Sequence, residues 1–149
     1  MKGYKFKLEP VLKIRKMKEE QCKAEIGKLQ VLITKWRTEI SRHDAGIKEA
    51  YESQEVGLKD GMNGQAIQFY PYFISGKQAH ISQIKTEIGL LEEQVKAKFH
   101  ELKSLRADLK VIEKMKEKDQ TKYKKDLNKR QFQEMEEQVQ NWKQALKLD

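Results

Sequence analysis

The chain has 149 residues, enough for about one domain; 36% of them are charged and 38% are hydrophobic. That balance excludes a thick globular core. The 8 glycines and 2 prolines are too few for the frequent turns of a barrel, a sandwich or a Rossmann domain. Such a composition is typical of long helices and coiled coils. The 31 basic and 23 acidic residues give a net charge of +8, which favours an acidic partner: a nucleic acid, an anionic membrane surface or an acidic protein.

The cellular location is indicated by what the sequence lacks. Cys22 is the single cysteine, so no internal disulfide can form, and a reducing compartment fits. No run of 18 or more apolar residues occurs, which predicts no transmembrane helix. Residues 1–7 are basic but lack the apolar segment of a secretory signal. We therefore expect a cytoplasmic protein.

A first helix is predicted from residue 8 to about residue 55. Apolar residues recur there at alternating spacings of three and four, which places them in one stripe along a helix. Arg15 and Glu19 interrupt the stripe near its start, and Pro10 falls in the first turn, where its missing N–H costs little. The strict seven-residue repeat predicts supercoiling against another helix. The two heptad positions hold mainly Leu12, Ile26, Ile33, Ile40 and Ile47, and Leu8, Cys22, Leu29, Trp36, His43 and Ala50.

A loop is predicted over about residues 56–66. Gly57, Asp60-Gly61 and Asn63-Gly64 have the chemistry of turns. A short loop between two long helices makes an antiparallel hairpin the default arrangement. An aromatic run, from Phe69 to Phe73, follows directly, and Pro71 within it is expected to open or kink the second helix.

The second helix is predicted from about residue 71 to about residue 146. Its seam turns polar between residues 113 and 125, and a new stripe in a shifted register follows it. The fold class is therefore all-α: a long antiparallel two-helix coiled coil, one hairpin spanning residues 1–149, expected to be a monomer. Its main seam consists of Ile74, Ile81, Ile84, Ile88, Leu91, Val95, Leu102, Leu105, Leu109 and Ile112, and the later stripe of Phe132, Met135, Val139, Trp142 and Leu146.

No catalytic constellation is found in the sequence. His43, His80 and His100 lack a second histidine or cysteine at metal-ligand spacing, and His43 and Cys22 lie on the stripe, where satisfied seam residues are expected. The phosphate-binding glycine motifs are absent. We therefore expect no enzyme activity, no metal and no cofactor. The basic stretches carry no base-reading motif, so nucleic-acid binding is only a weak alternative and no nucleic-acid partner is expected.

Three segments together resemble the family of the flagellar export protein FliJ, over nearly the whole chain. They are the aromatic run at 69–74, the stretch from Lys129 to Glu137, and the N-terminal pattern Tyr4-x-Phe6-x-Leu8-x-x-Val11-Leu12-x-Ile14-Arg15-x-x-x-Glu19. The resemblance implies a small component of the flagellar type III export apparatus that serves motility. Its coiled coil would resemble the gamma-subunit stalk of rotary ATPases. It would insert its terminal end into the export ATPase hexamer, link this ring to the export gate at the inner face of the cell membrane, and interact with export chaperones.

The resemblance also implies two binding surfaces. The ATPase would contact Arg15, Lys16, Lys18, Glu19, Arg130 and Gln131. The cytoplasmic domain of the export gate would contact Phe73, with Tyr72 and Phe69 sharing the role, although Lys77, His80 and Ile84 depart from the family's apolar patch. Capping of the hydrophobic seam is the competing interpretation of the three aromatic residues. The stalk of a virulence type III secretion system and a basic coiled coil that binds nucleic acid remain as alternative functions.

Overall fold

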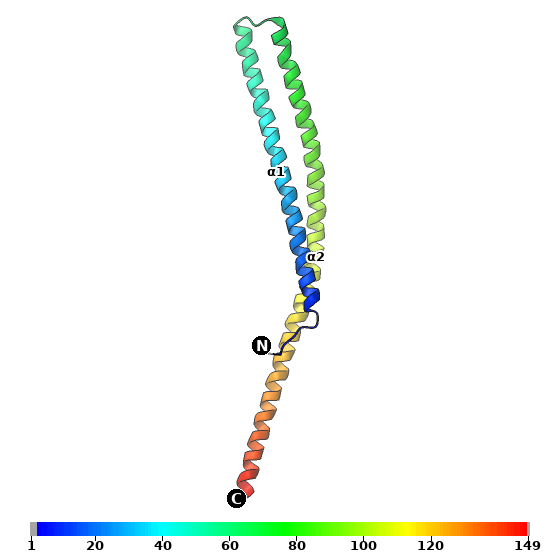
Figure 1. Ribbon diagram of the computed structural model, residues 1–149, viewed down its shortest axis with the longest axis vertical. Coiled ribbons are helices and arrows are strands. Elements are labelled where there is room, and N and C mark those ends of the chain that lie inside the picture. Colours follow the sequence, from blue (N-terminus) through cyan, green and yellow to red (C-terminus); the bar gives the residue numbers. More distant parts are fainter. Residues whose placement is uncertain (1–2, 149) are drawn as a thin grey trace. The chain divides into compact units, whose positions relative to one another are not determined.

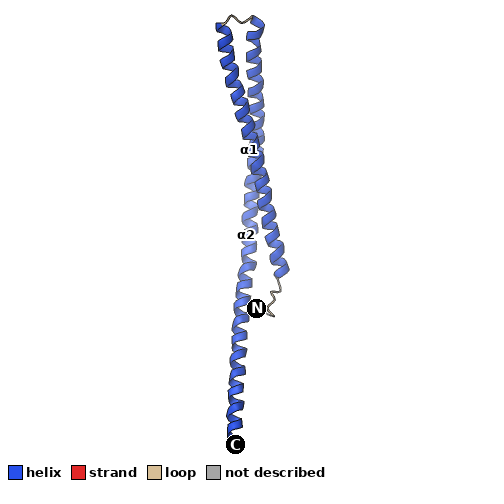
Figure 2. Cartoon of the chain, turned by 60° about the vertical axis from the view of Figure 1, so that its left-hand side comes forward, coloured by secondary structure: helices blue, strands red, loops and turns tan. Residues whose placement is uncertain are grey.

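The computed structural model describes residues 3–148, with side chains to residue 147, and these residues form an all-α hairpin. Helix α1 spans Glu9–Lys59 and helix α2 spans Gly64–Leu148 (Figure 1). Within the described residues there is no strand, and short non-helical segments precede α1 and join the two helices (Figure 2). The predicted fold class is confirmed.

The contacts divide the chain into two compact units. Unit 1 comprises Met1–Glu19 and Ser104–Asp149, and unit 2 comprises Glu20–Lys103. Unit 2 contains the turn between the helices, together with the parts of α1 and α2 on either side of it. Unit 1 contains the N-terminal segment, the first turns of α1 and the remainder of α2.

The core of unit 2 is a single seam between α1 and α2. Ile33 packs against Ile84 and Ile88, with Trp36, Ile40, Leu91 and Val95 around them. Ile33 is buried as the heptad predicts, whereas Ile40 and Leu91 are only half-buried. The reason is geometric: a partner helix covers one side only, and seam residues at its margin stay in contact with water. The Cys22 thiol, also on the seam, is buried and donates to the Lys98 carbonyl at 3.4 Å, and burial raises its pKa.

Ion pairs flank the seam of unit 2. Lys98 on α2 bonds Glu25 on α1 at 2.6 Å and Glu101 on its own helix at 3.2 Å, and these two carboxylates raise the pKa of Lys98. Arg37 reaches Glu92 across the seam at 2.9 Å. Ion pairs of such exposed side chains contribute little to stability, but the two that join the helices, Lys98–Glu25 and Arg37–Glu92, are satisfied only when the helices are paired in this register.

The connection between the helices is shorter than the predicted loop at 56–66, because both helices extend into it. Helix α1 runs to Lys59 rather than residue 55, and it ends with Gly61 in the left-handed region at a φ of 82°. The Met62 N–H donates to the Gly57 carbonyl at 2.9 Å, the bond of a Schellman cap. Asn63 then caps α2, accepting from the Ala66 N–H at 2.9 Å through its side chain.

Helix α2 therefore begins at Gly64, not at Pro71. Of the two expectations for Pro71, the opening of the second helix is wrong: the proline lies inside α2. The helix begins at the Asn63 cap, about two turns before the proline. A proline in a helix interior removes one main-chain hydrogen bond, which here leaves the Ile67 carbonyl without its helical donor.

The core of unit 1 includes residues that precede α1. Leu12 packs against Leu109 and Ile112 of α2, and Phe6, Leu8 and Val11 lie against this cluster. The Phe6 carbonyl accepts from the Glu9 N–H at 3.1 Å, which joins the N-terminal segment to the first turn of α1. The N-terminal segment thus belongs to the packed structure of unit 1.

Candidate protein-binding surfaces

Arg15 and Glu19 connect α1 to α2 in unit 1. The Arg15 guanidinium donates to the main-chain carbonyl of Asp108 at 2.8 Å. Glu19, whose side chain is 13% exposed, accepts from Arg106 Nε at 3.4 Å. The two polar interruptions of the first stripe are therefore interhelical contacts, which explains how a charged residue is tolerated at each seam position.

Lys16 and Lys18, in contrast, are exposed on α1. They lie on the same two turns as Arg15 and Glu19, but their side chains project into solvent. Of the four α1 residues expected to contact an ATPase, these two are the ones whose charge is displayed. The structure separates the set into two residues that hold the helices together and two that are accessible.

The polar part of the second seam is paired with the first turn of α1 and with the segment that precedes it. Lys116 binds Glu9 at 2.9 Å, and this hydrogen bond is the main cause of the lowered pKa of Glu9. The Tyr4 hydroxyl donates to Asp119 at 3.0 Å, and its ring lies 5.3 Å from that of Tyr123. Partial desolvation, and then the bond to Asp119, raise the pKa of Tyr4. The sequence predicted a polar seam between residues 113 and 125 but not the partners of its members. Glu9 lies in the first turn of α1 and Tyr4 lies before the helix, where a heptad pattern indicates no contact.

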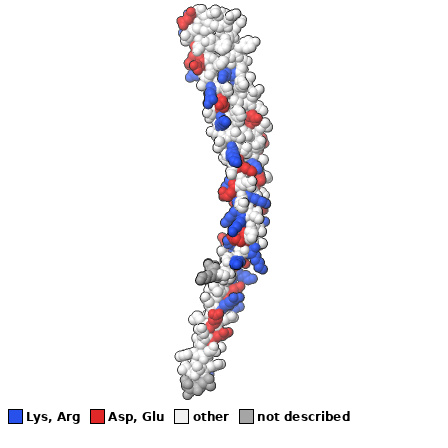
Figure 3. Space-filling model, viewed as in Figure 1, with Lys and Arg blue, Asp and Glu red and all other residues white. Residues whose placement is uncertain are grey.

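The net charge of the chain resides in unit 1. Its sequence segments hold 19 basic and 11 acidic residues, whereas those of unit 2 hold 12 of each. The net charge of +8 is therefore the charge of unit 1 alone. Figure 3 shows basic and acidic side chains interspersed along one face, and few charged side chains near the turn of unit 2. An acidic partner would be attracted to unit 1 rather than to unit 2.

Among the described residues of unit 1, the last part of α2 has no helix beside it (Figure 1). Every side chain described from Asn128 to Lys147 is exposed, including those of Arg130 and Gln131. One face of this segment is apolar, and we call it the C-terminal stripe. Its members, with their exposed fractions, are Phe132 63%, Met135 64%, Val139 49%, Trp142 64% and Leu146 54%. The stripe predicted from the sequence is present on the helix, and the first helix does not cover it.

The aromatic residues at the start of α2 divide between seam and surface. Tyr72 is 82% exposed and Phe69 is 60% exposed, whereas Phe73 is half-buried next to the buried Ile74. The Phe69 ring stacks on Phe73 at 5.9 Å and meets the Tyr70 ring edge-on at 5.7 Å. Tyr72 and Phe69 thus form the accessible part of this cluster.

A groove follows the aromatic cluster along unit 2. Lys77 lies over the Phe73 ring at 5.4 Å and donates to His43 Nδ1 of α1 at 3.2 Å. Because an ammonium group only donates, this bond requires His43 to be unprotonated at Nδ1. The His43 ring stacks on His80 of α2 at 5.6 Å.

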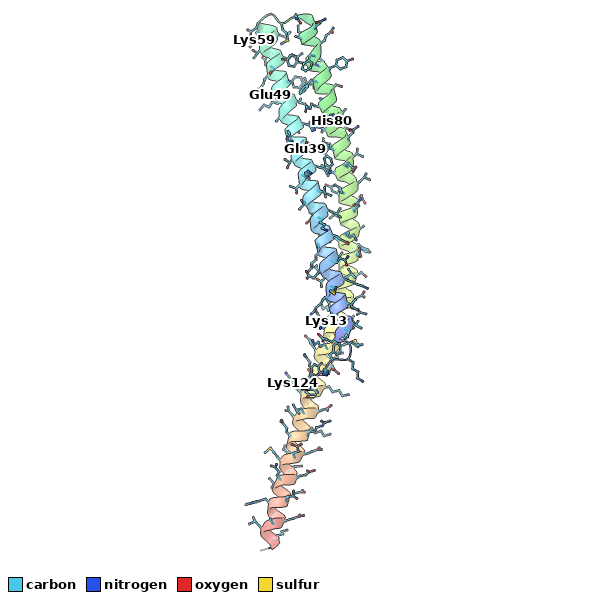
Figure 4. The ribbon with its side chains drawn as sticks, in the orientation of Figure 1. Lys13, Glu39, Glu49, Lys59, His80 and Lys124 are labelled. Carbon is cyan, nitrogen blue, oxygen red and sulfur yellow. The ribbon has the colours of Figure 1, made fainter. Side chains whose placement is uncertain are left out.

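The groove itself has a volume of about 290 Å³, and Glu39 of α1 and His80 of α2 both line it (Figure 4). Among the described residues, no group of three or more potential ligands is arranged to hold a metal ion. The histidine stacking was not predicted, although the seam position of His43 was the signal that it faces α2.

Comparison with known proteins decides the family. A family model described as flagellar FliJ protein matches residues 4–147, nearly the whole chain. The chain belongs to the FliJ family. No curated protein and no solved structure matches it significantly. Membership of the FliJ family places the chain among the components of the flagellar protein-export apparatus, and the resemblance read from the sequence is confirmed.

FliJ-family membership also bears on the groove that follows the aromatic cluster. Of the three residues expected to depart from an apolar docking patch, Lys77 is half-buried, His80 is exposed and Ile84 is buried. Ile84 therefore belongs to the seam. Lys77 contacts the Phe73 ring and His43, and His43 in turn stacks on His80. In the described part of this FliJ-family chain, neither helix contains a stretch long and apolar enough to cross a membrane.

Proposed function

We propose that this FliJ-family chain is the gamma-subunit-like stalk of the flagellar export ATPase. In this role it inserts its terminal end into the ATPase hexamer, links the ring to the export gate at the inner face of the cell membrane, and interacts with export chaperones. The proposal rests chiefly on unit 1, which combines the net charge of the chain with an unpaired helix whose side chains from residue 128 to residue 147 are exposed. A single exposed helix is narrow enough to be surrounded by a ring of subunits.

The ATPase-binding role falls on the exposed members of the expected set. Lys16, Lys18, Arg130 and Gln131 are accessible to a partner, whereas Arg15 and Glu19 position α1 against α2. Exposed charges mainly steer association and select the partner, and they contribute little to folding. Loss of these charges is therefore expected to weaken ATPase binding without unfolding unit 1.

Stimulation of ATP hydrolysis by the purified export ATPase tests this role. The double variant K16E/K18E is expected to lower stimulation at least tenfold at limiting concentration, and high salt is expected to lower that of the wild type. The control K28E/K35E makes the same change in net charge on exposed positions of α1 in unit 2. Equal stimulation by both variants would contradict the assignment of the ATPase contact to unit 1.

The gate-binding role falls on Tyr72 and Phe69, with Phe73 behind them. Contiguous exposed aromatic surface is unusual on a charged helical protein and often marks a binding site. Tyr72 and Phe69 together present two rings to solvent on the first turns of α2, and Phe73 supports Phe69 by stacking. These side chains are the ones that a gate domain can cover without disturbing the seam.

Nucleic-acid binding is a second candidate, favoured only by the concentration of positive charge in unit 1. A DNA mobility shift measured at about 50 and about 200 mM salt distinguishes it. Affinity that rests on phosphate contacts falls by orders of magnitude as the salt concentration rises over about this range. No shift at the lower salt concentration would exclude it. The family match is to the flagellar protein, which favours the flagellar machine over a virulence secretion system.

A further inference from the structure

The C-terminal stripe continues as a regular heptad along the helix. Its residues follow one another at spacings of three, four, three and four, so they form a continuous seam of the coiled-coil type. Val139 lies at the centre, with Phe132 seven residues before it and Leu146 seven residues after it. Met135 and Trp142 occupy the intermediate places, four before and three after. Because Phe132 and Leu146 are equidistant from Val139, and Met135 and Trp142 nearly so, a second copy of the stripe can align with the first when it runs in the opposite direction.

An antiparallel alignment about Val139 pairs large residues with small ones. Phe132 of one copy would lie opposite Leu146 of the other, and Met135 would lie opposite Trp142, so that each bulky ring meets an unbranched or aliphatic side chain. A parallel alignment would instead place Trp142 beside Trp142 and Phe132 beside Phe132. The apolar residues therefore fit the antiparallel arrangement better.

The charges beside the stripe favour the same arrangement. Glu136 and Lys143 lie on one flank of the stripe, seven residues apart, and both are exposed. In an antiparallel pair about Val139, Glu136 of each copy faces Lys143 of the other, which gives two ion pairs of opposite charge. A parallel pair would set Glu136 against Gln131, and Lys143 against Gln138, with no ion pair. Ion pairs of this kind select orientation more than they add affinity.

We propose that two copies of this chain associate through their C-terminal stripes as an antiparallel pair with two-fold symmetry. Such an interface is isologous, so each residue contact occurs twice. Burial of the exposed parts of five side chains from each copy, Phe132 and Trp142 among them, removes roughly 1,000 Å² from water, close to the lower limit of specific interfaces. The association is accordingly weak and concentration-dependent, unlike the monomer that a single hairpin predicts.

A charge exchange tests the proposal in the full chain. Sedimentation velocity from 5 to 500 μM is expected to show a monomer–dimer equilibrium in low salt. Glu136→Lys places a lysine against Lys143 of the other copy and should weaken dimerisation about tenfold, as should Lys143→Glu. The combined variant E136K/K143E restores the opposite charges and should restore the dimer.

Glu137→Lys provides the matched control. It makes the same charge change one residue away, on the side of the helix opposite the stripe, and should leave the dimer unaltered. Equal losses for E136K and E137K, or no recovery in E136K/K143E, would overturn the antiparallel pair. So would a wild-type chain that sediments as a monomer at every concentration.

The inference and the proposed ATPase role concern the same part of α2, but the two can fail separately. If the ATPase and the second copy of the chain both bind the stripe, addition of the purified ATPase to the dimer should release the monomer. The Trp142→Ala variant should then lose both the dimer and the stimulation of the ATPase. A chain that stays monomeric alone, but whose W142A variant still loses stimulation of the ATPase, would overturn the self-association and leave the proposed function standing. Unaltered stimulation by W142A together with loss of the dimer would support self-association alone.

Discussion

Arg15 on α1 donates a hydrogen bond from its guanidinium to the main-chain carbonyl of Asp108 on α2, at 2.8 Å. A carbonyl inside a helix already accepts from its own helix, so the guanidinium uses the second lone pair of the oxygen. The contact holds the two helices in register at a position where a heptad would have an apolar side chain. Arg15 is therefore a structural residue first, and its substitution changes unit 1 as well as any surface that unit 1 presents.

Arg15→Met is expected to lower the free energy of unfolding by about 1 kcal/mol, because the hydrogen bond is lost while the apolar stem of the side chain is kept. Lys16→Met, its neighbour on the exposed face, should change the free energy by less than about 0.5 kcal/mol. Urea unfolding followed by circular dichroism measures both. Equal midpoints for the two variants would show that the Arg15–Asp108 contact contributes nothing to stability.

The seam of unit 2 gives a second prediction. Ile33→Ala removes a side chain that is only 7% exposed and packs on Ile84 and Ile88, and it should cost about 2–3 kcal/mol, the lower part of the range for buried aliphatic residues. Leu32→Ala changes a neighbour of the same size that is 42% exposed and should cost under about 1 kcal/mol. Thermal unfolding distinguishes them, and similar midpoints would contradict the assignment of Ile33 to the core.

The heptad was sufficient to predict this seam, and the reason is physical. A long amphipathic helix with a single partner has one way to bury its stripe, so the positions of Ile33, Ile84 and Ile88 follow from spacing alone. The turn was less predictable, because Asn63-Gly64 has the same chemistry whether it lies within a loop or caps a helix. The bonds from the Ala66 N–H to the Asn63 side chain and from the Ile67 N–H to the Asn63 carbonyl distinguish the two.

The candidate surfaces could be predicted only in part. Charge at Arg15, Lys16 and Lys18 is visible in the sequence, but which of these charges is used between the helices depends on what the opposite helix offers. Asp108 offers a main-chain oxygen, which no side-chain pattern reveals. The exposure of the C-terminal stripe was likewise hidden, since a heptad indicates that a helix needs a partner but does not identify it.

Acid should weaken the contact between the first turn of α1 and α2. Lys116 lowers the pKa of Glu9 below its ordinary value of 4.5. The contribution of a carboxyl with a lowered pKa is complete above its ordinary pKa and is lost as the pH falls through the lowered one. Glu9→Gln should therefore be less stable than the wild type at pH 6, and the difference should disappear as the pH falls below 4.5.

The measurement is urea unfolding of both proteins from pH 7 to pH 3, in low salt because the Glu9–Lys116 pair is partly exposed and salt screens it. Glu134→Gln, at an exposed position beyond the paired part of α2, is the control and should show no pH-dependent difference from the wild type. A Glu9→Gln difference that stays constant across the whole pH range would rule out the ion pair as its cause.

The aromatic cluster gives the prediction that separates binding from folding, and it rests on the proposed gate contact. Tyr72→Ala should weaken binding to the cytoplasmic domain of the export gate at least fivefold, with little change in melting temperature, because the ring is 82% exposed. Phe73→Ala should weaken binding and also lower the melting temperature, because this ring stacks on Phe69 and lies under the Lys77 ammonium.

Phe99→Ala supplies the control for both variants. Phe99 is also on α2 in unit 2 and is 49% exposed, but it lies many turns from the cluster. Phe99→Ala should therefore bind the gate domain as the wild type does. Gate binding is measured by calorimetry on the same samples that are melted. Full binding by Tyr72→Ala, with a lower melting temperature for Phe73→Ala, would mean that the cluster caps the seam of unit 2 and that the gate contact lies elsewhere.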